Sequence, residues 1–161
     1  MRALPGHGVS RLILAPLTAR DAKPAAALYA RCFDKPWKPE DFRRFAEDAA
    51  RPCFTARDGT RLSGFVLASL AADEGEILSL CVAPEYRRRG IGSALLERLR
   101  EALIAHGTQA FFLEVNARNV GAIRLYESAG FQAVGKRPAY YQTSKGAQDA
   151  LIMRLSLPAG S

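Results

Sequence analysis

Residues 81–93 constrain the fold of this chain most, because an apolar strand there passes through a basic, glycine-containing turn directly into an amphipathic helix. The turn carries three consecutive arginines at residues 87–89, followed by Gly90 and Gly92. The helix repeats apolar residues at helical spacing from Ile91 to Leu103. A strand that leads into a helix in this way is typical of α/β proteins.

The flanking sequence supplies the other elements of such a fold. Helices are predicted from a Thr18/Asp21 capping box through Phe33, from Pro39 toward Ala50, over residues 91–106 and over residues 119–129. Strands are predicted over residues 11–14, 53–57, 61–71, 76–82, 110–115, 131–134 and 150–155. We expect one α/β domain over residues 11–157, with a central mixed sheet and helices on both faces, after a flexible tail at residues 1–10. A length of 161 residues leaves no room for a second full domain.

The charge balance indicates an anionic partner. Against 16 acidic residues stand 23 Lys and Arg, and the formal net charge is +7. The excess is uneven, since residues 1–80 hold 12 basic and 10 acidic side chains, whereas residues 81–161 hold 11 and 6. Phosphates, acidic peptides and nucleic acid are therefore the candidate partners, and the second half of the chain is where we expect them to bind.

Cysteine and histidine usage argues against several kinds of site. Cys32, Cys53 and Cys81 form no CxxC pair, the chain has two histidines, and a metal is not indicated. The cysteine pattern suits a reducing cytoplasm, and no apolar run approaches the ~18 residues of a membrane span. We therefore expect a cytoplasmic protein without membrane contact.

The basic turn has the chemistry of a phosphate cradle. Glycines at positions 90 and 92 let an anion approach the backbone, and the helix that begins there presents unpaired N–H groups. It is not a Walker loop, since no Gly-Lys-Ser/Thr follows. The alternative is a solvated arginine loop with glycines that only form a turn.

Two motifs in this half resemble the GNAT superfamily of N-acetyltransferases. Residues 87–92 match its Q/R-x-x-G-x-G/A acyl-CoA motif, and residues 119–131 match its N-x-x-A-x-x-L-Y-x-x-x-G-F block. The resemblance implies the GNAT acyl-CoA N-acyltransferase fold with a mostly antiparallel sheet, a splayed pair of parallel strands, and acetyl-CoA as donor and co-substrate. It also implies that the pantetheine arm pairs with Leu80, Cys81 and Val82, and that the pyrophosphate binds at Arg87, Arg88, Arg89, Gly90, Ile91, Gly92 and Ser93.

Acetyl transfer to an amine needs a base for the amine and a proton for the leaving thiolate. Glu114, a lone carboxylate in an apolar strand, is the candidate base; the alternative is an ion pair with an arginine such as Arg118. Tyr126 is the candidate acid and donor contact because the family's tyrosine at this motif position commonly has that role; the alternative is a core aromatic. Asn119 is either a donor contact or a helix N-cap, and Cys81 is better explained as a buried small residue than as a nucleophile.

Within the superfamily the chain is most similar to the ribosomal-protein-alanine N-acetyltransferases. The resemblance implies transfer to the N-terminal α-amine of a small-subunit ribosomal protein, with Glu114 as base and Tyr126 as acid. One departure is Gln142, where that family commonly has proline after two tyrosines. Two other functions stay open: acetylation of lysine or a small-molecule amine, and a non-catalytic RNA- or ribosome-binding module based on residues 136–141. We expect direct nucleic-acid binding to be absent if the enzyme interpretation holds.

Overall fold

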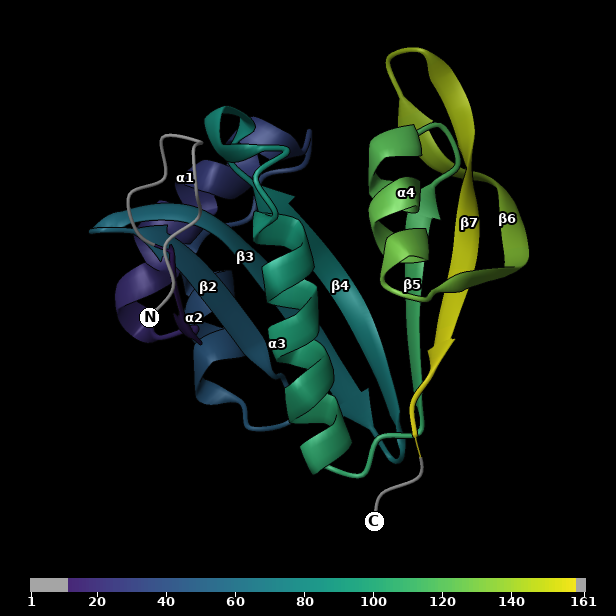
Figure 1. The fold of residues 1–161 in the computed structure, drawn as a ribbon. Helices are drawn as coiled ribbons and strands as arrows, with labels where there is room; N and C mark the ends of the chain where they lie inside the picture. Colours follow the sequence, from purple (N-terminus) through teal and green to yellow (C-terminus); the bar gives the residue numbers. More distant parts are fainter. Residues whose placement is uncertain (1–11, 159–161) are drawn as a thin grey trace.

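Seven strands form one sheet in the order β1-β2-β3-β4-β5-β7-β6 in the computed structural model, which describes residues 12–158 (Figure 1). The strands are β1 (Leu12–Pro16), β2 (Cys53–Asp58), β3 (Arg61–Ala71), β4 (Glu74–Val82), β5 (Ala110–Asn116), β6 (Gln132–Thr143) and β7 (Gly146–Ser156). Neighbouring strands are antiparallel except β4 and β5. The predicted mixed, mostly antiparallel α/β sheet is confirmed. The predicted tail at residues 1–10 lies outside the described residues.

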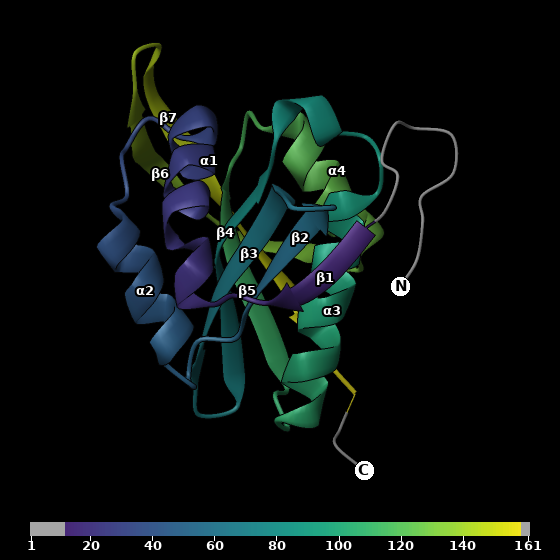
Figure 2. The ribbon, with the colours of Figure 1, turned by 90° about the vertical axis from the view of Figure 1, so that its left-hand side faces the viewer.

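Helices cover both faces of this sheet, as predicted. Figure 2 shows α1 (Ala22–Cys32) and α2 (Pro39–Glu47) on one face, with α3 (Ile91–Ala105) and α4 (Val120–Ser128) on the other. Two 3-10 turns, η1 (Ala19–Asp21) and η2 (Pro84–Tyr86), precede α1 and α3. Between residues 12 and 158 no helix has both the length and the apolarity needed to span a bilayer.

The capping box is present, but it opens a 3-10 turn before the helix. The Thr18 amide donates to Asp21 Oδ2 at 2.8 Å, while the other carboxylate oxygen of Asp21 accepts from Arg57 on β2. Asp21 is 5% exposed, so the arginine compensates a carboxylate removed from water. This ion pair attaches the start of α1 to the sheet.

The last two strands are longer than predicted. They form one extended hairpin, whereas the sequence indicated only residues 131–134 and 150–155. Most of β6 is exposed, so it lacks the alternation of apolar and polar residues that marks a half-buried strand. Pro138 in its middle argues further against a regular strand. The extra length carries β6 and β7 beyond the rest of the sheet, beside the open end of β4 and β5 (Figure 1).

Candidate active site

The two parallel strands of the sheet diverge after a short paired segment (Figure 1). β4 and β5 pair from Glu74 with Ala110 to Ile77 with Leu113, and β5 then continues against β7. The rest of β4, from Ser79 to Val82, keeps its pairing with β3 but has no strand partner toward β5. This is the splayed pair implied by the resemblance. Backbone groups at such an edge are free to bind a ligand that carries amides.

A β-bulge marks the point of divergence. Leu67 pairs with Ser79, but the next residue, Ala68, pairs with Ile77, so Leu78 is an extra residue in β4. Leu78 is 42% exposed. Within residues 12–158, Ser79 Oγ is the buried side-chain oxygen or nitrogen that lacks a hydrogen-bond partner. A buried polar atom of this kind next to an open strand edge is typical of a site built for a ligand.

The basic turn has the backbone geometry of an anion site. Gly90, at the start of α3, has φ +80 and no side chain to cap the helix, and a Cβ there would meet nothing within 4 Å. The first N–H groups of α3 have no acceptor within the helix. Arg88 also has a positive φ, of 61, which folds the turn back over the helix start. An anion can therefore reach these amides, where the helix dipole favours it.

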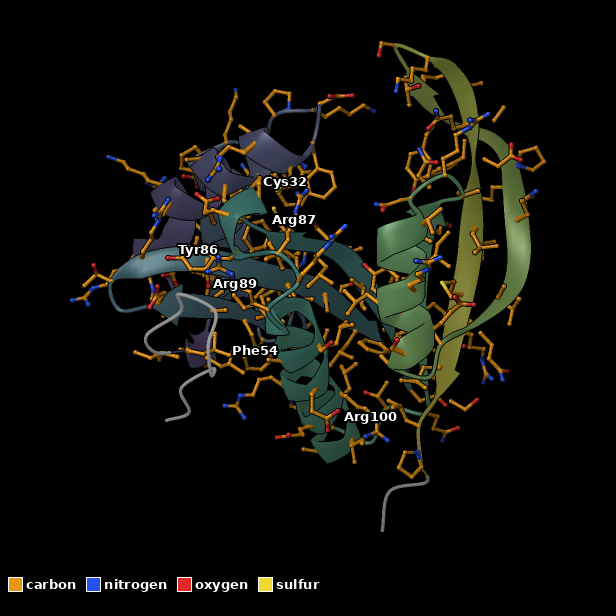
Figure 3. The ribbon with its side chains drawn as sticks, turned by 45° about the horizontal axis from the view of Figure 1, so that its top comes forward. Cys32, Phe54, Tyr86, Arg87, Arg89 and Arg100 are labelled. Carbon is orange, nitrogen blue, oxygen red and sulfur yellow. The ribbon has the colours of Figure 1, made fainter. Side chains whose placement is uncertain are left out.

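The three arginines of this turn have different surroundings (Figure 3). Arg87 Nε donates to the Val82 carbonyl at 3.2 Å, and its Nη2 lies 3.8 Å from Cys32 Sγ. The Arg89 guanidinium lies 5.6 Å from the centre of the Tyr86 ring. Arg88 is exposed. The side chains of Arg87 and Arg89 thus contact other parts of the protein. A solvated arginine loop would not need these contacts.

The structure gives a different reason for a glycine at position 92 from the one expected from the sequence. A Cβ at Gly92 would come within 2.9 Å of Leu125 Cδ2, on α4. The glycine therefore allows α3 to pack closely against α4, whereas the expectation was that it keeps space for an anion. Of the two glycines, Gly90 is the one with a positive φ, a conformation that glycine adopts more easily than other residues do.

Glu114 lies on β5 and forms an ion pair. Its Oε1 is 2.9 Å from Arg137 Nε, and its side chain is 20% exposed. The alternative of an ion pair is therefore present in the structure, although the partner is Arg137 on β6 and not Arg118. Both residues line a cavity of about 310 Å³ that Glu74 and Glu76 also line. Three carboxylates and one arginine make this cavity suited to a cationic ligand.

Tyr126 is a buried aromatic on α4. It is 7% exposed, and its ring packs edge-on against Phe131 with 5.7 Å between ring centres. Burial, and then the neighbouring Tyr141, raise the pKa of Tyr126. Burial, followed by Glu114 and Tyr140, raises the pKa of Tyr141 to about 12. Tyr141 therefore interacts electrostatically with both predicted catalytic residues.

A distortion in the last hairpin places Arg137 and Tyr141 at this site. Arg137 pairs with Ala150 and Tyr141 with Gln148, so β6 has two more residues than β7 between these pairs. The bulged segment contains Ala139 with φ 53, whose amide donates to Asp149 Oδ1 at 2.8 Å. Gln142, the departure from the family pattern, donates from Nε2 to the Ala139 carbonyl at 3.3 Å and holds the same segment.

Sequence reasoning missed Arg137 and Tyr141 as site residues, although both lie in the basic and aromatic stretch at residues 136–141. Asn119 is an N-cap, since its side chain accepts from the Ala122 amide at 3.2 Å. Cys81 is 2% exposed, in agreement with a buried small residue.

The sequence profile of the Acetyltransferase (GNAT) family matches residues 6–131. The chain belongs to the GNAT family. It is similar to the [ribosomal protein bS18]-alanine N-acetyltransferase of Salmonella typhimurium, at 35% identity over 144 residues that cover 88% of this chain and 95% of the relative. It is also similar to the N-alpha-acetyltransferase RimI of Mycobacterium tuberculosis, at 40% identity over 86% of this chain and 88% of the relative.

Solved structures agree with this assignment. The ribosomal-protein-S18-alanine N-acetyltransferase from Escherichia coli superposes with a TM-score of 0.86 at 31% identity, covering 94% of this chain and 97% of that chain. Arabidopsis thaliana NAA60 in complex with acetyl-CoA shares the fold, with a TM-score of 0.80 at 21% identity, covering 91% of this chain and 98% of that chain. The protein is an acetyl-CoA-dependent N-acetyltransferase.

The features of this GNAT chain fit an acyl-CoA donor. The open edge of β4 offers amide and carbonyl groups of the kind that pair with pantetheine amides. The uncapped start of α3 and the adjacent arginines suit a pyrophosphate. The cavity lined by Glu74, Glu76 and Glu114 is acidic and is therefore suited to an amine.

Proposed function

We propose that this enzyme transfers the acetyl group of acetyl-CoA to the N-terminal α-amine of a protein, and that the acceptor is the N-terminal alanine of a small-subunit ribosomal protein. The position of Glu114 carries the proposal: its carboxylate lies in an acidic cavity beside the strands that diverge. The name of the Salmonella relative supports a ribosomal-protein alanine as acceptor, and the name of the Mycobacterium relative supports transfer to an α-amine; each match covers more than four fifths of this chain.

The donor binds across the turn and the open strand edge in this proposal. Leu80, Cys81 and Val82 pair with the pantetheine arm, and the pyrophosphate binds at Arg87, Arg88, Arg89, Gly90, Ile91, Gly92 and Ser93. Asn119 and Tyr126 contact the donor from α4. The free edge of β4 and the uncapped helix start support these assignments.

Glu114 acts as the general base. A carboxylate can accept the amine proton directly, and the ion pair with Arg137 holds the Glu114 side chain in place. A free α-amine has a pKa of about 7.7 to 8.0, against about 10.4 for lysine, so it requires less of the base. This difference favours an N-terminus as acceptor. The neutral amine then attacks the thioester carbonyl directly, and no covalent enzyme intermediate forms.

Tyr126 acts as the general acid toward the leaving CoA thiolate. The raised pKa of its hydroxyl keeps the proton on the oxygen until a strong base, such as a departing thiolate, is beside it. Its packing against Phe131 holds the ring in place. In this proposal Tyr141, which is half-buried and interacts electrostatically with Glu114, borders the acceptor.

The expected partners are acetyl-CoA and a protein N-terminus, in the cytoplasm, with no metal and no membrane. The second candidate function is acetylation of lysine or a small amine, which the same acidic cavity favours because both are cationic. A non-catalytic RNA- or ribosome-binding module is less well supported, since Lys136 and Arg137 are already paired with Asp149 and Glu114.

A peptide panel tests the proposal. Peptides that differ in the first residue, each with an internal lysine, are incubated with the enzyme and acetyl-CoA, and products are mapped by mass spectrometry. A copy of each peptide with a blocked N-terminus is the matched control. We expect acetylation at the free α-amine, strongest for alanine, and none on blocked peptides. Transfer only to internal lysines would contradict the proposal and support the second candidate.

A further inference from the structure

Two of the three cysteines lie side by side between α1 and β4. Cys32 is the last residue of α1, and its Sγ lies 3.8 Å from the carbonyl oxygen of Val82, the residue after Cys81. Cys81 Sγ lies 3.8 Å from the carbonyl oxygen of Leu28, one helical turn before Cys32. Each thiol thus lies against the backbone of the element that carries the other cysteine.

Arginines surround the outer member of this pair. Arg87 Nη2 lies 3.8 Å from Cys32 Sγ, and Figure 3 shows the two residues next to each other. Arg31, the preceding residue, is held by Glu85 at 2.8 Å. The Cys81 thiol, Arg87 and Arg31 together lower the pKa of Cys32 to about 6, against the effect of burial. Contact with Cys32, together with burial, raises the pKa of Cys81.

The two sulfurs differ in access as well as in charge. Cys32 is half-buried, whereas Cys81 is 2% exposed. A small reagent can therefore reach Cys32 from solvent, and Cys81 is the nearest group that can react with the product. An accessible low-pKa thiol beside a second thiol is the arrangement of cysteines that respond to oxidants. Cys53 provides the contrast, because burial raises its pKa to about 12.

We propose that Cys32 and Cys81 are a redox-active dithiol, which a small hydroperoxide oxidises to a disulfide. The Cys32 thiolate attacks a peroxide oxygen, the O–O bond breaks, and the leaving alkoxide takes up a proton to become an alcohol. Cys81 sulfur then attacks the sulfur of the Cys32 sulfenic acid, the S–O bond breaks, and hydroxide leaves as water with the Cys81 proton. The dithiol loses two electrons, and the hydroperoxide is reduced to one alcohol and one water.

The Cys32–Cys81 disulfide would form next to the proposed donor site. Cys81 belongs to the open segment of β4, and Arg87 belongs to the basic turn, so the disulfide would remove the thiolate partner of Arg87 and join α1 to β4. This consequence rests on the proposed binding of the donor phosphates at the turn. The thiol chemistry does not, and it can be tested without any donor or acceptor.

Full-length protein treated with stoichiometric hydrogen peroxide, then alkylated and measured by intact mass and peptide mapping, tests the proposal. Before alkylation, we expect the oxidised protein to be about 2 Da lighter than the untreated protein. After alkylation, it should carry one alkyl group, and the Cys32 and Cys81 peptides should be linked. Reduction with dithiothreitol should restore three thiols. Three free thiols after peroxide, or a disulfide that contains Cys53, would overturn the proposal.

Variants distinguish the role of Cys32, which attacks the peroxide, from that of Cys81, which closes the disulfide. Cys81→Ser should stop at a sulfenic acid on Cys32 that dimedone traps, Cys32→Ser should give neither product, and Cys53→Ser should behave like the wild-type protein. Arg87→Gln should slow alkylation of Cys32 by iodoacetamide severalfold at neutral pH, with Arg88→Gln as its matched control. Disulfide formation in Cys32→Ser, or equal alkylation rates in the two arginine variants and the wild-type protein, would contradict the proposed roles of Cys32 and Cys81.

Discussion

Arg137 Nε lies 2.9 Å from Glu114 Oε1, so the predicted catalytic base is paired with an arginine from the last hairpin. This contact joins two residues that are distant in the sequence, on strands β5 and β6, which β7 separates. In the proposed mechanism the acceptor amine enters the same cavity. Arg137 is therefore a positioning residue for Glu114, and its removal should leave the carboxylate less well oriented.

Arg137→Gln should lower kcat about tenfold, with a smaller change in KM for acetyl-CoA, because a carboxylate without this partner is held less precisely in the cavity. The measurement is steady-state peptide acetylation, with the free energy of unfolding measured alongside. Lys136→Gln is the matched control, since Lys136 pairs with Asp149 instead, at 3.5 Å. A fall in kcat that Arg137→Lys does not partly restore, together with a loss of stability, would show that Arg137 only supports the fold.

Glu114→Gln should lower the acetylation rate by about 10² or more, since the amide cannot accept the amine proton. The loss should be greatest at low pH, where less of the acceptor amine is neutral. Acetyl-CoA affinity, measured by calorimetry, should stay within about twofold. Glu101→Gln, at an exposed position of α3, is the control. Unchanged activity would remove Glu114 from the mechanism.

Tyr126→Phe should lower kcat at saturating acetyl-CoA by at least about tenfold, because the phenyl ring keeps the packing against Phe131 but cannot donate a proton. Stopped assays that follow free CoA would measure this. Tyr140→Phe, at a position that is 50% exposed, should have little effect on kcat. A kcat equal to that of the wild-type enzyme would leave Tyr126 a core aromatic only.

The same tyrosine should make stability depend on alkaline pH. Burial raises the pKa of Tyr126 in the folded protein, while an unfolded tyrosine ionises near pH ~10. Above that pH the unfolded chain has released a proton that the folded protein retains, so the free energy of unfolding falls as pH rises. The contribution is fully present below pH ~10 and should decline by up to ~1.4 kcal/mol per pH unit above it.

Urea unfolding of the wild-type protein and Tyr126→Phe at pH 9 and pH 11 would test this. The variant should lose less stability between the two pH values than the wild-type protein does. An equal loss in the variant and the wild-type protein would mean that the Tyr126 hydroxyl ionises as easily in the folded protein as in the unfolded chain.

Local signals made most of the fold predictable from sequence, while contacts between distant segments were not. The strand, turn and helix around Gly90 were predictable because glycine, arginine and periodic leucines act within a few residues. The Glu114–Arg137 pair was not, since it joins β5 to a strand, β6, that has almost no buried residues and so lacks a clear pattern in the sequence. The packing role of Gly92 was missed for the same reason, because its missing Cβ faces Leu125, on another helix.

The turn at Gly90 can be tested against a glycine of similar conformation. Gly90 has φ +80 and Gly59, in the turn between β2 and β3, has φ +63, and a Cβ at either would meet nothing within 4 Å. Alanine at each position should therefore cost a similar ~1 to 2 kcal/mol of stability, from backbone strain alone. In Gly90→Ala the new methyl group would also crowd the amides that we propose bind the pyrophosphate, so calorimetry should show weaker CoA binding than in Gly59→Ala. Equal CoA affinity in the two variants would remove the phosphate assignment, because strain is common to both and closeness to the anion is not.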